Sequence, residues 1–254
     1  MKNNSYIIGI DLAWGSRVEK YNHIRKLKND GVCIVSANKN KYEFLKISYP
    51  NGNTELIETL KPYIDNSKQV LVLIDAPVVC PNSKGARPVD RLTHSLFHSE
   101  HAACHPANST KCSRPLNIVK LLKNMGLRIG YNIQKDSHLI IEVYPHPAMV
   151  RLFKLKKIFK YKKGLIEEKK LEFINYQNAF KKFLNENLPE LKINQEINEL
   201  LKKSWTKENE DLLDAVFCAT LGVWHHKYRG KKSEVIGNLK TGFILLPLDL
   251  REIN

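Results

Sequence analysis

Five acidic residues stand at the ends of apolar segments, where their side chains could gather into one site: Asp11, Asp75, Glu142, Asp211 and Asp214. The apolar runs before the first three have the length of buried strands, and ligands of α/β proteins bind where such strands end. Asp211 and Asp214 are three residues apart, so a helix would place them on one face. The pattern predicts a cluster of carboxylates.

Such a cluster suits a divalent cation. Mg²⁺ is a hard ion that carboxylates hold, and it assists the cleavage of phosphodiester bonds by bridging the phosphate. Without a cation, the carboxylates would repel one another and raise one another's pKa values. We therefore predict a site for Mg²⁺ or Mn²⁺ formed by Asp11, Asp75, Glu142 and Asp214, with Asp211 as a further catalytic residue. Taken singly, Asp11 or Asp75 could equally be a turn residue after its strand.

Hydropathy patterns predict the elements that must position these carboxylates. Three strands come first, and the few polar residues between the second and third favour an antiparallel hairpin. A helix then leads to a fourth, buried strand, which gives the order β-β-β-α-β. The predicted strands cover residues 6–10, 31–37, 42–48, 70–74, 138–144 and 242–247, and the predicted helices cover 53–61, 91–103, 113–125, 167–187, 194–203 and a segment from 208 onward. The prolines at 145 and 147 should end the fifth strand and keep the chain extended.

Composition predicts a single domain over residues 1–254, with a loop-rich insertion at about 76–115 and a basic helical insertion at about 150–205. The share of hydrophobic residues is 43%, and no apolar stretch approaches the roughly 18 residues of a membrane span. We expect no membrane partner. The first residues lack the features of a secretory signal, so we expect a cytoplasmic protein with reduced thiols.

The net charge of +15 points to a polyanionic partner, although a Lys-rich and Asn-rich genome would give the same balance. Residues 151–170 contain nine Lys or Arg and two Glu, with Phe153, Phe159 and Tyr161 between them. Lysines pair with phosphates, while aromatic rings stack on bases or pack on the protein. We predict a nucleic-acid-binding ridge that includes Lys156, Lys157, Lys162 and Lys163. The alternative is a solvated helical face.

Six short segments carry a family resemblance: GIDLAW (9–14), IDAP (74–77), GARPVDR (85–91), EVYPHPA (142–148), DLLDA (211–215) and GFILLP (242–247). Together they resemble the motif series of the predicted nucleases grouped as domain of unknown function 429. The resemblance implies an α/β, ribonuclease H-like fold with a five-stranded mixed sheet flanked by helices, in which the first three strands are antiparallel. It also implies catalytic carboxylates on the first strand, the fourth strand and the last helix, places that Asp11, Asp75 and Asp214 fill.

Further residues of these segments are candidates for substrate contact. Guanidinium groups match phosphate oxygens, which favours Arg87 and Arg91. Asp90 could contact substrate or hold an arginine in place, and Trp14 is a further candidate for substrate binding. His146 is a candidate for orienting the attacking water.

Three functions remain open at this point. The first is a Mg²⁺-dependent nuclease. The second is a phosphotransferase or ATP-binding protein of related fold, although such proteins need two lobes and a second glycine-rich loop. The third is a noncatalytic nucleic-acid-binding protein. Separately, a zinc site could form from the His and Cys residues of the 94–112 loop, at His94, His98, His101, Cys104, His105 and Cys112.

Overall fold

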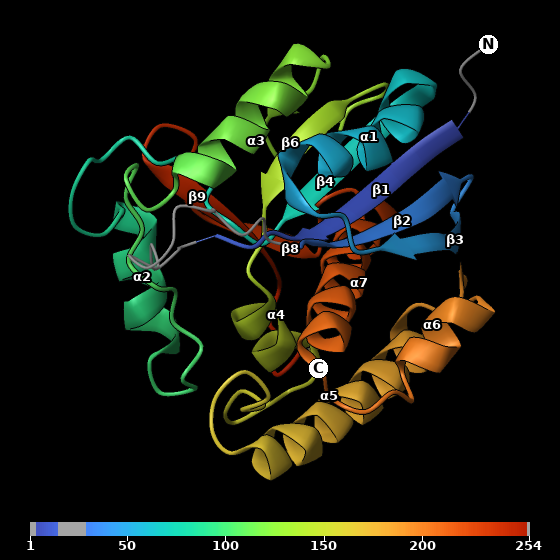
Figure 1. The fold of residues 1–254 in the computed structure, drawn as a ribbon, viewed down its shortest axis with the longest axis vertical. Coiled ribbons are helices and arrows are strands. Elements are labelled where there is room, and N and C mark those ends of the chain that lie inside the picture. Colours follow the sequence, from blue (N-terminus) through green and yellow to red (C-terminus); the bar gives the residue numbers. More distant parts are fainter. Residues whose placement is uncertain (1–3, 15–28, 253–254) are drawn as a thin grey trace.

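A seven-stranded mixed sheet with helices on both faces forms the centre of the molecule (Figure 1). The structure is a computed structural model and describes residues 4–14 and 29–252. The strands are β1 (Asn4–Asp11), β2 (Gly31–Asn38), β3 (Lys41–Ser48), β4 (Ser67–Ile74), β5 (Arg128–Ile129), β6 (His138–Glu142) and β7 (Leu191–Lys192), and their order in the sheet is β5-β6-β4-β1-β2-β3-β7. A second, two-stranded sheet pairs β8 (Ser233–Asn238) with β9 (Gly242–Pro247).

The strand directions agree with the predicted β-β-β-α-β order. β1 and β2 are antiparallel, as are β2 and β3, whereas β4 runs parallel to β1 and β6 runs parallel to β4. The prediction of five strands was wrong, because β5 and β7 extend the sheet at its two edges. Each of these strands has two residues, too few to produce the alternation of apolar and polar residues that identifies a strand in a sequence.

Helices cover the two faces of the sheet unequally (Figure 1). α1 (Gly52–Asp65) and α3 (Ser113–Asn124) lie on one face, and α7 (Lys207–Lys227) crosses the other. The remaining helices are α2 (Pro88–Phe97), α4 (Pro145–Leu152), α5 (Ile166–Asn187) and α6 (Gln195–Leu200). No helix in the described ranges combines the length and the apolar character needed to cross a membrane.

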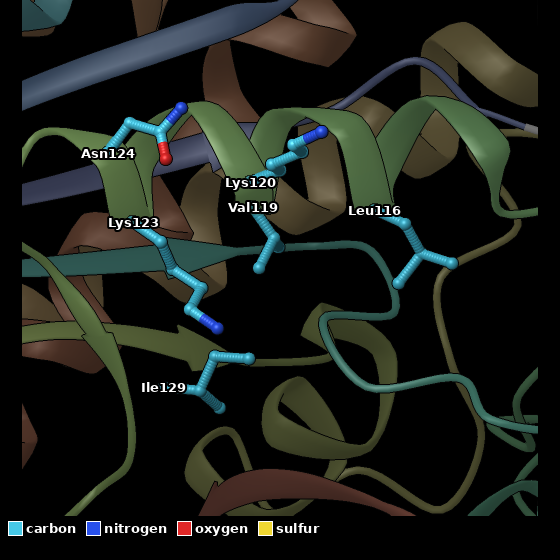
Figure 2. A pocket seen from close by; sticks show the side chains of 6 residues that line it. All are labelled: Leu116, Val119, Lys120, Lys123, Asn124 and Ile129. Carbon is cyan, nitrogen blue, oxygen red and sulfur yellow. The ribbon is translucent and has the colours of Figure 1, made fainter.

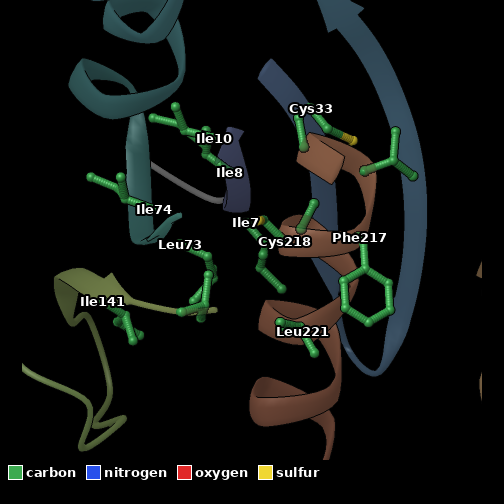
Figure 3. Close-up of a cluster of buried hydrophobic side chains, with 14 of the residues drawn as sticks. Ile7, Ile8, Ile10, Cys33, Leu73, Ile74, Ile141, Phe217, Cys218 and Leu221 are labelled. Atoms are coloured by element: carbon green, nitrogen blue, oxygen red, sulfur yellow. The ribbon is translucent and has the colours of Figure 1, made fainter. Parts of the chain in front are cut away.

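The packing of α7 on the sheet depends on small residues at the contact. A Cβ at Gly9 would overlap the backbone of Ala215 and Ala219, and one at Gly31 would overlap the backbone of Asp211. α7 therefore lies closer to β1 and β2 than larger residues would permit. Apolar side chains of the strands and of α7 fill the space beside this contact, among them Ile7, Leu73, Phe217, Cys218 and Leu221 (Figure 3). These residues are buried, so the helix is fixed over the carboxyl end of β1.

Two predicted boundaries differ from the structure because of proline. Residues after β6 do not stay extended: α4 begins at Pro145, and α2 begins at Pro88 rather than at residue 91. Proline lacks the N–H that the first turn of a helix leaves unpaired, so it is well tolerated there. The same residue type that ends a strand therefore begins the next helix.

The basic segment 153–165 is irregular, and the aromatic residues within it face the protein interior. Tyr161 is fully buried, and its ring lies 5.0 Å from that of Tyr176 in α5. Phe153 and Phe159 are partly buried against the same tyrosine. Of the two roles considered for these rings, the structure supports packing on the protein rather than stacking on bases.

Candidate active site

Asp11 and Asp75 lie side by side at the carboxyl ends of two neighbouring parallel strands. Ile10 of β1 is level with Ile74 of β4, and the Asp75 amide donates to the Ile10 carbonyl at 2.9 Å. Each aspartate follows directly after its paired isoleucine, so both side chains share one face of the sheet. That face is the one covered by α7, because Gly9, two residues before Asp11, contacts α7 directly.

α7 brings the third carboxylate, Asp214, to the same place. Asp214 is fully buried, and its two oxygens have different partners. Oδ1 accepts a hydrogen bond of 2.8 Å from the Tyr161 hydroxyl. Oδ2 lies 2.6 Å from the Lys162 ammonium. Two consecutive residues of the basic segment therefore hold one aspartate of α7.

The charges of these groups act on one another. Burial raises the pKa of Asp11 well above its ordinary value; Lys162 opposes the shift, while Asp214 and Asp75 add to it. Burial likewise raises the pKa of Asp75 to about 7, again opposed by Lys162 and reinforced by Asp214. For Lys162, burial lowers the pKa, but Asp214, Asp11 and Asp75 outweigh it and raise the pKa well above its ordinary value. Three carboxylates thus share one ammonium group.

Asp211 lies at the margin of this cluster. One oxygen accepts a hydrogen bond of 2.8 Å from the Tyr49 hydroxyl, and the other lies 2.7 Å from the Lys207 ammonium. Its negative charge also helps to raise the pKa of Asp11. Of the two acids on α7, Asp214 is therefore the one held at the centre of the cluster.

Glu142 belongs to a different group of charges. In the register between β4 and β6, Glu142 pairs with Ile74, the residue before Asp75. Successive residues of a strand point to opposite faces, so Glu142 and Asp75 point to opposite faces of the sheet. Arg87 donates to both of its oxygens, at 2.9 and 2.7 Å, and the Val78 amide donates at 2.8 Å. The charge of Glu142 helps to raise the pKa of Asp75, but its oxygens bind Arg87 and Val78 instead of facing Asp11.

Arg87 and Asp90 complete this second group. The Arg87 side chain is 2% exposed and donates to Asp90 as well as to Glu142. Asp90 also accepts hydrogen bonds from the backbone amides of Arg87 and Ala107. Buried charges that are paired in this way hold loops together. Neither side chain is accessible in this arrangement, so the structure offers no surface through which Arg87 or Asp90 would contact a substrate.

Asp30 and Arg114 support the cluster and were not predicted. Asp30 is fully buried, accepts a hydrogen bond of 2.9 Å from the Ala13 amide, and pairs with Arg114 at 2.6 Å. Arg114 also donates to the Ala13 carbonyl. These contacts fix the backbone two residues beyond Asp11. The only sequence signal was an acid directly before Gly31, which a turn explains equally well.

His146 lies beside the cluster at the start of α4. Burial, followed by the positive charge of Lys162, lowers its pKa to about 3, so the imidazole is neutral at physiological pH. Its Nδ1 lies 3.4 Å from the Tyr144 hydroxyl, which donates to the Ala103 carbonyl at 3.1 Å. Ala103 also lines a hollow in the surface, together with Arg91, His94 and His105.

The remaining candidates lie outside the acidic cluster. Lys156, Lys157 and Lys163 are exposed, and Arg91 is exposed on α2. Trp14 is partly buried against Cys80, Ala107 and Cys112. Another hollow, lined by Lys120 and Lys123 together with Leu116, Val119, Asn124 and Ile129, follows α3 on the face of the sheet away from α7 (Figure 2).

The donor set of the cluster fits a hard divalent cation. It offers carboxylate oxygens, and Asp214 Oδ2 is buried with no hydrogen bond of ordinary geometry from any described residue. Yet among residues 4–14 and 29–252, no group of three or more His, Cys, Asp or Glu is arranged to hold a metal ion. In the described chain the carboxylates face Lys162 instead. The same finding covers the His and Cys residues of the 94–112 loop.

The fold and the site together define an α/β protein with an acidic cluster at the carboxyl ends of two parallel strands. The chain belongs to the family described as Protein of unknown function (DUF429), which matches residues 9–233. The predicted family resemblance is thereby confirmed.

Comparison of structures found similarity to the human cytomegalovirus terminase nuclease domain, with a TM-score of 0.34 and 12% sequence identity over 85% of this chain and 82% of that chain. No curated protein matches the chain.

Proposed function

We propose that this protein is a metal-dependent nuclease of the ribonuclease H-like class, in which Asp11, Asp75 and Asp214 hold a divalent cation. One observation carries the proposal: three carboxylates from three separate elements converge on a single positive group. Burial, together with the smaller effect of the carboxylates on one another, raises the pKa of Asp11 and Asp75, which costs stability at neutral pH. Clusters that are unfavourable for the fold are typical of functional sites.

Each residue has a role in this proposal. A divalent cation, when bound, would activate water and neutralise charge on a phosphate group. Asp11, Asp75 and Asp214 supply the oxygens for it. His146 is neutral because its pKa is lowered to about 3, and a neutral imidazole can orient a water molecule through its unprotonated nitrogen. Glu142 is not included, since Arg87 and Val78 already use its oxygens.

A nucleic acid is the proposed substrate because of the charge around the cluster. Lys156, Lys157 and Lys163 are exposed on the segment that carries Lys162, and the whole chain has a net charge of +15. Arg91 lines the hollow that adjoins His146 through Ala103 and Tyr144. Phosphates of a bound strand would pair with these side chains while one phosphate reaches the carboxylates.

The phosphotransferase alternative receives less support. Proteins of that kind need two lobes, each with its own large sheet. The described part of the chain contains one large sheet, and the other sheet has two strands.

Cleavage assays test the proposal. Purified protein should cleave at least one of single-stranded, duplex, hybrid or junction substrates with Mg²⁺ or Mn²⁺. Asp11→Asn should lower the cleavage rate by at least about 10²-fold, because the substitution removes a charge that holds the cation. Nucleic-acid binding should persist. Asp136→Asn is the matched control, since Asp136 is exposed and pairs only loosely with Lys68 at 3.8 Å. A wild-type protein that cleaves none of these substrates would contradict the proposal.

A further inference from the structure

The ion pair of Lys162 and Asp214 joins a loop to the centre of the candidate metal site. The Lys162 side chain is 28% exposed, whereas Asp214 is fully buried, and 2.6 Å separates Nζ from Oδ2. Nζ also lies 5.7 Å from the centre of the Tyr161 ring. The ammonium therefore reaches inward from the surface and ends at Asp214 Oδ2, a buried oxygen that has no other partner among the described residues.

The residues around Lys162 anchor the backbone but leave the side chain able to move. Tyr161 is fully buried and holds the other oxygen of Asp214. Lys163 is exposed, and Gly164 has a φ of 109°, a value that glycine adopts readily. Lys162 thus lies directly after a fixed residue and two residues before Gly164, and its long side chain has four carbon–carbon bonds that can rotate.

The Lys162 ammonium offsets the repulsion among the three aspartates. Asp11, Asp75 and Asp214 are close enough to act on one another and on Lys162. Removing the ammonium would leave like charges facing each other in a partly dehydrated site. A divalent cation would relieve the same repulsion, but it would need the Asp214 oxygen that Lys162 now contacts. Two cations cannot share that oxygen without repelling one another.

We propose that Lys162 is a tethered cation that holds the three aspartates together in the metal-free protein, and that a divalent cation must displace it from Asp214 in order to bind. This inference rests on the proposed function, because it assumes that the aspartates form the metal site. The inference adds a competing cation that belongs to the protein itself, so that metal binding is coupled to displacement of the Lys162 side chain.

The test is a titration with MnCl₂ in the absence of nucleic acid. Mn²⁺ should bind Lys162→Met about tenfold or more tightly than wild type, because the competing ammonium is gone. Lys162→Met should also melt at a lower temperature than wild type in EDTA and show the larger rise in melting temperature on addition of Mn²⁺. Lys160→Met, an exposed lysine two residues before Lys162, is the control and should match wild type in both measurements.

The outcomes separate this inference from the proposed function. Equal Mn²⁺ affinity in wild type and Lys162→Met, or tighter binding by wild type, overturns the inference while leaving the metal site itself in place. Binding by neither protein overturns both. If Lys162→Met does not fold in EDTA, recovery of folded protein by refolding with Mn²⁺ supports the inference, and failure to recover overturns it. The double variant Lys162→Met/Asp214→Asn should fold without metal and lose the tight binding.

Discussion

Replacement of Arg87 by Met tests whether the Arg87 group is structural. The guanidinium donates to Asp90, Glu142 and the Val79 carbonyl, and its side chain is 2% exposed. Met fills much of the same volume but leaves two buried carboxylates without their cation. Water cannot replace the arginine, because Asp90 is 2% exposed and Glu142 is 3% exposed.

The expected loss is large. Removing one partner of a buried ion pair typically costs about 3 to 5 kcal/mol of unfolding free energy. With a urea slope of about 3 kcal/mol per M, the unfolding midpoint should fall by about 1 to 2 M. Burial already raises the pKa of Glu142 and Arg87 opposes that shift, so the variant should raise it further. An acid whose pKa is raised in the folded state destabilises the fold as pH rises, so the loss should be greater at pH 8 than at pH 5.

Urea denaturation at both pH values, followed by far-ultraviolet circular dichroism, measures this loss. Arg91→Met on the same helix is the control, because Arg91 is exposed and should change the unfolding free energy by less than about 0.5 kcal/mol. A loss below about 1 kcal/mol for Arg87→Met would refute the structural role. Unchanged stability together with weaker nucleic-acid binding would restore the role in substrate contact.

Two further predictions concern the helix contact and a buried histidine. Gly9→Ala should lower the unfolding free energy by more than about 2 kcal/mol, since the added Cβ would overlap the backbone of Ala215. Gly130→Ala is the control: the added Cβ would lie 3.6 Å from the nearest atom, in Leu139, so this variant should cost far less in the same urea titration. Burial lowers the pKa of His225, whose Nε2 lies 2.7 Å from the Tyr131 carbonyl. The unfolded chain therefore binds the proton more readily, and stability should fall by up to about 1.4 kcal/mol per unit as pH drops below about 6.5. His225→Gln should flatten that dependence, and an unchanged slope would assign it to other groups.

The sequence allowed prediction of Asp11 and Asp75 because their positions depend on local pattern. Each follows an apolar run, and a parallel sheet aligns the ends of such runs. Glu142 also ends an apolar run, but its side chain points away from those of Asp11 and Asp75, because β6 pairs Glu142 with Ile74 rather than with Asp75. A shift of one residue reverses the face of a side chain, and no hydropathy pattern specifies register that finely.

The partner of Asp214 could not be predicted for a different reason. Lys162 is one of many lysines in a basic segment, and nothing in its neighbours distinguishes it from Lys163. The distinction arises from Tyr161, which anchors the turn inside an aromatic cluster formed with α5. Contacts between segments more than fifty residues apart depend on how the helices pack, and that packing is a property of the whole fold.

The glycine-lined contact between α7 and the sheet also bears on synthesis of the protein. β1, β2 and β4 leave the ribosome long before α7, which is the last helix of the described chain. Until α7 emerges, the face around Gly9 and Gly31 stays uncovered, and Asp11 and Asp75 have neither Asp214 nor a closed site around them. A nascent chain that ends before residue 207 therefore cannot assemble the cluster. Whatever chemistry the cluster performs therefore begins only after residues 207–227 have been synthesised and have packed on the sheet.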